Sequence, residues 1–119
     1  MNELMRRGAR RATRRPPPRT QALLADCITE GHALVETIRE SLNRVPDETY
    51  RAWCERVEKV LEEEQRAGRL HRASLAEFRT ALAPSQRLSD HYPQAVWNQL
   101  HPLVAKVERL LAISHRQVQ

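Results

Sequence analysis

The densest group of chemically capable side chains is a set of arginines near the N-terminus. Seven arginines fall within the first 20 residues, at Arg6, Arg7, Arg10, Arg11, Arg14, Arg15 and Arg19. Guanidinium groups bind phosphates, and an arm of this size would contact about five to seven of them. The segment has no aromatic residue to stack on bases, so its expected binding to a polyanion is electrostatic and independent of base sequence.

Charge is divided sharply along the chain. Residues 1–20 carry a net charge of +6, whereas residues 21–119 carry −1. We therefore expect attraction to a polyanion from the N-terminal segment alone. Three roles stay open for this tail: an arm that contacts nucleic acid or another polyanion, a targeting address, and a disordered, solvated leader. In each role the three prolines at 16–18 would hold the arginines off the bundle as a stiff spacer.

The remaining candidates for chemistry favour structural roles. Cys27 and Cys54 stand beside apolar residues on predicted helices, which indicates buried free thiols and a reducing, cytoplasmic setting. The histidines lack the spacing of helical metal sites, so no metal ion is expected. Three glycines are too few for a phosphate-binding loop. The sequence predicts a protein that is not an enzyme and has no catalytic residue and no cofactor.

The elements that position these residues are helices separated by glycine and proline. Apolar residues at helical spacing predict helices from about Thr20 to Asn43, from Pro46 to Gly68, from Ser74 to Pro84, and through Val96 to Leu111. No alternating pattern predicts a strand. The expected fold is all-α: a compact antiparallel bundle of about four helices in residues 21–119, preceded by a disordered Arg/Pro-rich tail in residues 1–20.

Several positions inside these helices carry expectations of their own. Gly31 lies in the apolar stripe of the first helix, where it is either tolerated or marks close approach of a neighbouring helix. Trp53 and Phe78 are expected in the core. Pro102 interrupts the last helix, but the apolar stripe keeps its phase, which favours one kinked helix. Residues 62–64 are three glutamates, which we interpret as a solvated face because consecutive helical residues point in different directions.

The third helix raises an alternative function. Ser74 and Glu77 fit a capping box at its start, and Leu82 falls on its apolar side. Because this helix follows another one after Gly68, residues 53–83 imitate the helix-turn-helix of a nucleic-acid-binding protein. The start of the third helix offers apolar and acidic side chains, however, and the three glutamates before it would repel phosphate. A plain corner of the bundle is the favoured interpretation.

Trp97 lies one position off the apolar stripe of the last helix. It is either an exposed anchor for a protein interface or a cover for the loop at residues 84–92. The expected function is a non-catalytic protein-interaction module, such as an adaptor, a regulator or a small subunit of a larger assembly, with an arm that contacts a polyanion. Its partners would be another protein or further copies of itself in a homo-oligomer, and non-specific nucleic acid through the tail. No apolar run is long enough to span a membrane.

Overall fold

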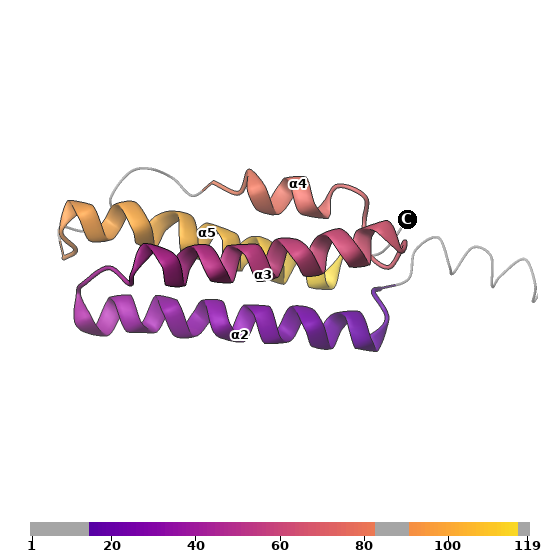
Figure 1. The fold of residues 1–119 in the computed structure, drawn as a ribbon, viewed down its shortest axis with the longest axis horizontal. Helices are drawn as coiled ribbons and strands as arrows, with labels where there is room; N and C mark the ends of the chain where they lie inside the picture. The colour runs from indigo at the N-terminus through magenta and orange to yellow at the C-terminus, as the bar shows by residue number, and fades with distance from the viewer. Residues whose placement is uncertain (1–14, 83–90, 117–119) are drawn as a thin grey trace, which may run out of the picture.

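The computed structural model describes residues 15–82 and 91–116, and these ranges contain four helices and no strand. The helices are α2 (Pro18–Ser41), α3 (Asp47–Arg66), α4 (Ser74–Arg79) and α5 (Gln94–His115). Their directions alternate along one long axis (Figure 1). The prediction of an all-α, antiparallel bundle of about four helices is confirmed. Residues 1–14 of the tail lie outside the described residues.

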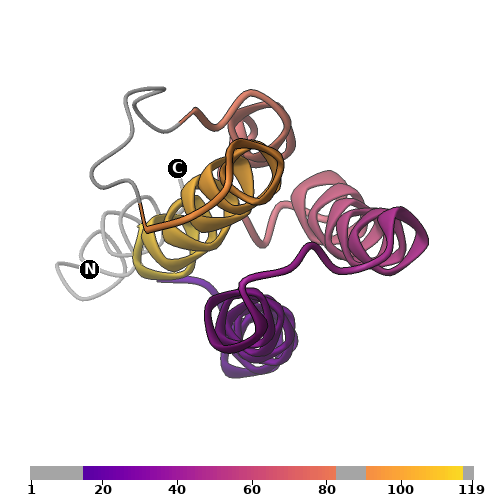
Figure 2. The same cartoon turned by 90° about the vertical axis from the view of Figure 1, so that its left-hand side faces the viewer.

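The four helices form a ring in cross-section. α2 packs against α3 and α5 on one side, and α4 packs against the same two helices on the other (Figure 2). The most extensive of these contacts joins α2 and α5. α4 has six residues, whereas α3 and α5 have 20 and 22. The fourth side of the bundle is therefore covered along only part of its length.

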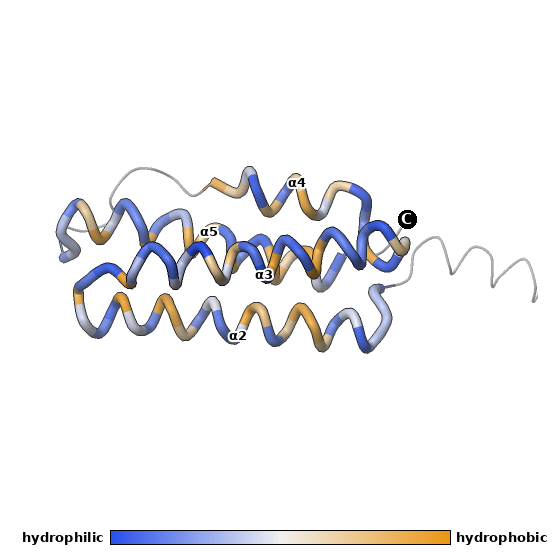
Figure 3. The backbone as a smooth tube through the Cα atoms, viewed as in Figure 1, coloured by the Kyte–Doolittle hydropathy of each residue, from blue (hydrophilic) through white to orange (hydrophobic). Residues whose placement is uncertain are grey.

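The apolar stripes of the helices meet in a single core. Positions of high hydropathy recur turn by turn along α2, α3 and α5 (Figure 3). Trp53 and Phe78 are both fully buried, as predicted, and their rings meet edge to face with centroids 5.8 Å apart. The indole Nε1 of Trp53 donates a hydrogen bond of 2.9 Å to the backbone carbonyl of Cys27. This bond fixes the largest core side chain against α2, because a buried indole N–H needs an acceptor.

Gly31 is the point of closest approach in this core. A Cβ atom there would lie 2.7 Å from Cζ2 of Trp53 and 2.7 Å from Cγ2 of Val107. Both distances are shorter than any ordinary contact between carbon atoms. The structure thus decides between the two interpretations of Gly31: it marks the close approach of neighbouring side chains.

The ends of α2 and α3 follow from their local residues. α2 begins at Pro18, two residues earlier than predicted, because proline suits a first helical position where no N–H partner is needed. Pro16 is buried, so the proline segment lies against the bundle at that point. The predicted boundary between residues 20 and 21 thus falls inside a helix. α3 ends at Arg66, two residues before Gly68, whose φ of 77° suits the turn that follows the helix.

The last two helices differ in how well the sequence predicted them. α5 runs unbroken through Pro102, which confirms one long helix. α4 ends at Arg79 rather than near Pro84, and Leu82 is 89% exposed instead of lying on the apolar side. The capping box is also wrong: Ser74 lies inside the helix, its buried hydroxyl has no hydrogen-bond partner among the described residues, and Glu77 binds Arg116 instead. A residue of α3 caps this helix instead.

Candidate interaction surfaces

Only two of the seven arginines predicted to bind a polyanion lie within the described residues. Arg6, Arg7, Arg10, Arg11 and Arg14 lie outside the described residues. Arg15 precedes α2, and Arg19 lies in its first turn. Both are exposed. The structure therefore places the last two members of the set on the surface at the start of the bundle.

A buried carboxylate holds the bundle together where the tail enters it. Glu62 and Glu63 are exposed, but Glu64 is only 5% exposed, which corrects the interpretation of all three as a solvated face. The Thr20 hydroxyl donates to Oε1 of Glu64 (2.6 Å), and Nε and Nη2 of Arg69 donate to its two carboxylate oxygens (3.0 and 2.8 Å). The Arg69 hydrogen bonds are the main reason why the pKa of Glu64 is lowered. The start of α2 is thereby tied to the α3–α4 turn.

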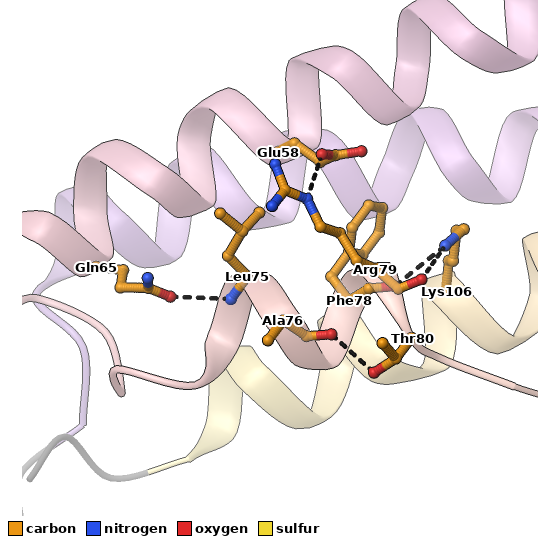
Figure 4. A network of polar contacts seen from close by, with 8 residues as sticks. All are labelled: Glu58, Gln65, Leu75, Ala76, Phe78, Arg79, Thr80 and Lys106. Carbon is orange, nitrogen blue, oxygen red and sulfur yellow. Dashed lines mark hydrogen bonds and ion pairs between the residues drawn. The ribbon is translucent and has the colours of Figure 1, made fainter.

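The short helix α4 is held at both of its ends by side chains of other helices (Figure 4). Oε1 of Gln65 on α3 accepts a hydrogen bond of 2.9 Å from the N–H of Leu75, which replaces the predicted capping box. The ammonium group of Lys106 on α5 donates to the carbonyl of Phe78 (3.1 Å) and lies 4.8 Å from the centre of its ring. Arg79 binds Glu58 of α3 at 2.7 Å. Helix propensity alone would not hold six residues in place.

The carboxylate of Glu77 connects α4 to the end of α5. Nη1 and Nη2 of Arg116 donate to its two oxygens at 2.6 and 2.8 Å. This bidentate pair lowers the pKa of Glu77. The carboxylate that the sequence assigned to a capping box thus joins two helices.

The predicted interface residue, Trp97, lies in a row along the outside of α5. Trp97, His101, Val104 and Leu111 recur at steps of four, three and seven, and we call them the α5 outer row. The first three are half-buried, whereas Leu111 is 37% exposed. Tyr92 stacks on Trp97 with ring centroids 6.5 Å apart, and His101 follows at 5.6 Å from Trp97.

The α5 outer row meets a shallow groove on α2. The groove has a volume of about 300 Å³, and Ala25, Ile28 and Thr29 line it opposite Leu111. Tyr92 belongs to the loop that the sequence offered as the alternative contact for Trp97, and its stacking supports that contact. Residues 84–90 of the loop lie outside the described residues. The exposed Glu108 lies between Val104 and Leu111 on the same helix face, and the groove lining also includes polar residues, namely Gln21, Thr29, Ser114 and His115. The surface is therefore mixed, and its apolar part is centred on Trp97 and Val104.

A second groove lies between the N-terminal halves of α3 and α5. It has a volume of about 410 Å³, and we call it the α3–α5 groove. Its lining consists of Arg44, Asp47, Tyr50, Arg51, Cys54, Asn98, Gln99 and Pro102. The Gln99 amide accepts from the N–H of Val45 and donates to its carbonyl, both at 2.9 Å, and so fixes the α2–α3 loop to α5. Sequence reasoning gave no signal for this groove.

The cysteines are poor nucleophiles in these surroundings. Both are free, and Cys27 is buried, whereas Cys54 is half-buried and lines the α3–α5 groove. Burial raises the pKa of Cys27 to about 11 and also raises the pKa of Cys54, so little thiolate is present at neutral pH. No three His, Cys, Asp or Glu side chains of the described ranges come together in a way that could hold a metal ion. None of the described helices has the length and apolar character to cross a membrane.

Residues 53–82, the described part of the stretch that imitates a helix-turn-helix, place the short second helix against the bundle, while Leu75, Ala76 and Glu77 of its first turn stay at least partly exposed. α4 runs back along α3 (Figure 1), with Phe78 in the core and Ser74 fully buried at its first turn. A recognition helix needs the side chains of that turn to reach base edges. The chain matches no protein-family model, no curated protein and no solved structure.

Proposed function

We propose that this protein is a non-catalytic interaction module, an adaptor, regulator or small subunit of a larger assembly, whose bundle binds a protein and whose arginine arm contacts a polyanion. The observation that carries the proposal is the partly exposed start of the α5 outer row, where Trp97, His101 and Val104 lie together on one helix face. Its tryptophan is held by ring stacking, so little side-chain freedom would be lost on binding. The free thiols agree with work in the reducing cytoplasm.

Arg15 and Arg19 support the role of the arm. Both are exposed at the point where the tail meets α2. The bundle supplies position, and the arm supplies adhesion that depends on salt. Because arms of this kind bind nucleic acid with a Kd of only about 10⁻⁴ to 10⁻⁶ M, contact through the bundle would raise the local concentration of the arm at its target.

The interface is tested by comparing captured partners. Trp97→Ala should lose the partner that the wild-type chain captures, because truncation of a central aromatic anchor commonly costs about 2 kcal/mol or more of binding free energy. Leu82→Ala is the matched control, since Leu82 is apolar and 89% exposed but lies outside the row. Light scattering of both variants would show whether the partner is a second copy. If wild type and Trp97→Ala capture identical partners, the α5 outer row is not the binding surface.

The arm is tested by a salt titration of binding to random-sequence DNA and RNA. Full-length protein should give a slope of log affinity against log salt of about −4 to −6, and the variant with all seven arginines of residues 1–20 changed to glutamine should lose it. A control variant with Arg39, Arg66 and Arg72 changed to glutamine, all exposed on the bundle, should keep the slope. Equal loss in the control would move the site to the bundle and favour the nucleic-acid-binding alternative.

A further inference from the structure

We propose that the α3–α5 groove is a second docking site, which takes an acidic amphipathic helix of another protein. The groove lies on the side of α5 that carries Pro102 and Lys106, away from the outer row of Trp97. The proposal therefore goes beyond the interface proposed above and does not depend on it.

The groove continues the surface on which α4 is seated. On α3, Tyr50 and Cys54 precede Glu58 by eight and four residues, and Leu61 and Gln65 continue the same helix face. On α5, Asn98 and Pro102 precede Lys106 by eight and four residues. Glu58, Gln65 and Lys106 all bind α4. The faces that hold one helix thus extend for several turns beyond its end.

The open part of these faces is long enough for a helix of about three turns. The six residues of α4 cover about 9 Å of an α3 helix that is about 30 Å long. Asp47 and Glu58 lie 11 residues apart, which corresponds to about 16 Å of helix. Beyond α4 the chain turns toward the other side of α5, where Ala81 and Leu82 lie against Ala105 and Arg109. Within the described residues, no segment lies in the groove.

The chemistry of the groove indicates what it binds. The ring of Tyr50, the thiol of Cys54 and the ring of Pro102 supply apolar surface. Burial raises the pKa of both Tyr50 and Cys54, so both groups stay neutral at physiological pH. Because Pro102 has no N–H, the carbonyl of Asn98 lacks its usual helical donor and is available as an acceptor. An occupant with an apolar stripe and a few polar groups fits this surface.

The rim of the groove sets the charge of the occupant. Arg44 binds Asp47 at 2.6 Å, whereas Arg51 has no ion pair within the described part of the chain. Among the residues that line the groove, the two arginines therefore outnumber the single acidic residue, Asp47, by one. One turn beyond Cys54, outside the groove lining, α4 meets the acidic Glu58 of α3 with the cationic Arg79. By the same complementarity, a helix in the groove would meet Arg51 with an acidic side chain.

The experiment uses two synthetic helical peptides of about 15 residues, a length at which isolated helices become stable enough to bind as such. Both carry leucines at helical spacing, and their flanking positions are glutamates in one and lysines in the other. Binding to the full chain is measured by fluorescence anisotropy. In parallel, the alkylation rates of Cys54 and Cys27 are followed by mass spectrometry, with the buried Cys27 as an internal reference.

The glutamate peptide should slow alkylation of Cys54 and leave that of Cys27 unchanged. Its affinity should exceed that of the lysine peptide at least about tenfold, and Arg51→Glu should reverse this preference. Arg72→Glu, an exposed control outside the groove, should preserve it. Trp97→Ala should also bind the glutamate peptide normally, which separates this site from the α5 outer row.

Three results would overturn the proposal. Equal affinities for the two peptides would contradict the prediction that the bound helix is acidic. Binding without any change at Cys54 would place the peptide elsewhere. Slower alkylation of Cys54 as the protein concentration rises, with no peptide present, would show that the groove is filled by a second copy of the chain.

Discussion

At the scale of single residues, Gly31 shows how little space the core leaves. Gly31→Ala should lower the free energy of unfolding by about 1–2 kcal/mol. The new methyl group would overlap Trp53 and Val107, and overpacking costs about 1–3 kcal/mol, which outweighs the gain of up to about 1 kcal/mol in helix propensity. Urea denaturation measures the change. Glu40→Ala, at an exposed position of the same helix, should stay within about 0.5 kcal/mol of wild type, and equal stability of Gly31→Ala would contradict the close packing.

Glu64 should make the free energy of unfolding depend on pH in the acidic range. Its pKa is lowered in the folded state, so its contribution is complete above the unfolded value of about 4.3 and is lost as pH falls through the folded value. Glu64→Gln should cost about 1–3 kcal/mol at pH 7, and the difference from wild type should shrink as pH falls below about 5.

Denaturation midpoints at a series of pH values measure this effect. Glu63→Gln is the neighbouring control, because Glu63 is exposed. A difference between wild type and Glu64→Gln that is constant with pH would show that the carboxylate is not ionised in its pairing with Arg69. Some dependence on acid should remain in the variant, since the pKa of Glu77 is also lowered.

At the scale of elements, α4 depends on contacts from other helices. Lys106→Met should make the amides of residues 78–81 exchange hydrogen faster, because the carbonyls at the end of α4 lose their donor and Phe78 loses the cation over its ring. The global free energy of unfolding should fall by about 1–2 kcal/mol. Hydrogen exchange followed by mass spectrometry reports both changes. Lys59→Met, at the other lysine of the chain and exposed on α3, is the control, and unchanged exchange in α4 of Lys106→Met would show that Lys106 does not hold it.

The elements differ in how far the sequence could predict them. The long helices were predicted to within a few residues because their apolar stripes are local patterns of the chain. α4 was predicted too long, because the sequence does not reveal that Gln65 and Lys106 define its ends from two other helices. Glu64 was missed for the same reason, since its partner Thr20 lies 44 residues away. The half-buried position of Trp97 agrees with its phase on α5, but its role at an interface stays a prediction. The α3–α5 groove has no local signal in the sequence, because it results from how much of the bundle α4 leaves uncovered.

At the scale of the whole molecule, the bundle begins at Pro18, before the change in net charge between residues 20 and 21. A shortened chain that starts at Arg15 should melt at the temperature of the full chain. One that starts at Gln21 should lose about 1–2 kcal/mol, because it lacks the first turn of α2 and the Thr20 hydrogen bond to Glu64. For a domain of this size, such a loss lowers the melting temperature by roughly 4–16 °C. Circular dichroism measures both melts, and equal values would show that residues 15–20 add nothing to the fold.

The contact between α2 and α5 has a consequence for how the protein is made. α2 leaves the ribosome first and α5 last, yet the most extensive packing joins these two helices. Until α5 has been synthesised, the apolar stripe of α2 lacks its main partner, and loop closure must bring residues some 80 positions apart together. Leu24 and Ile28 on that stripe thus stay without their main partner until α5 has been made, and this is the stage at which a holdase chaperone would bind the nascent chain.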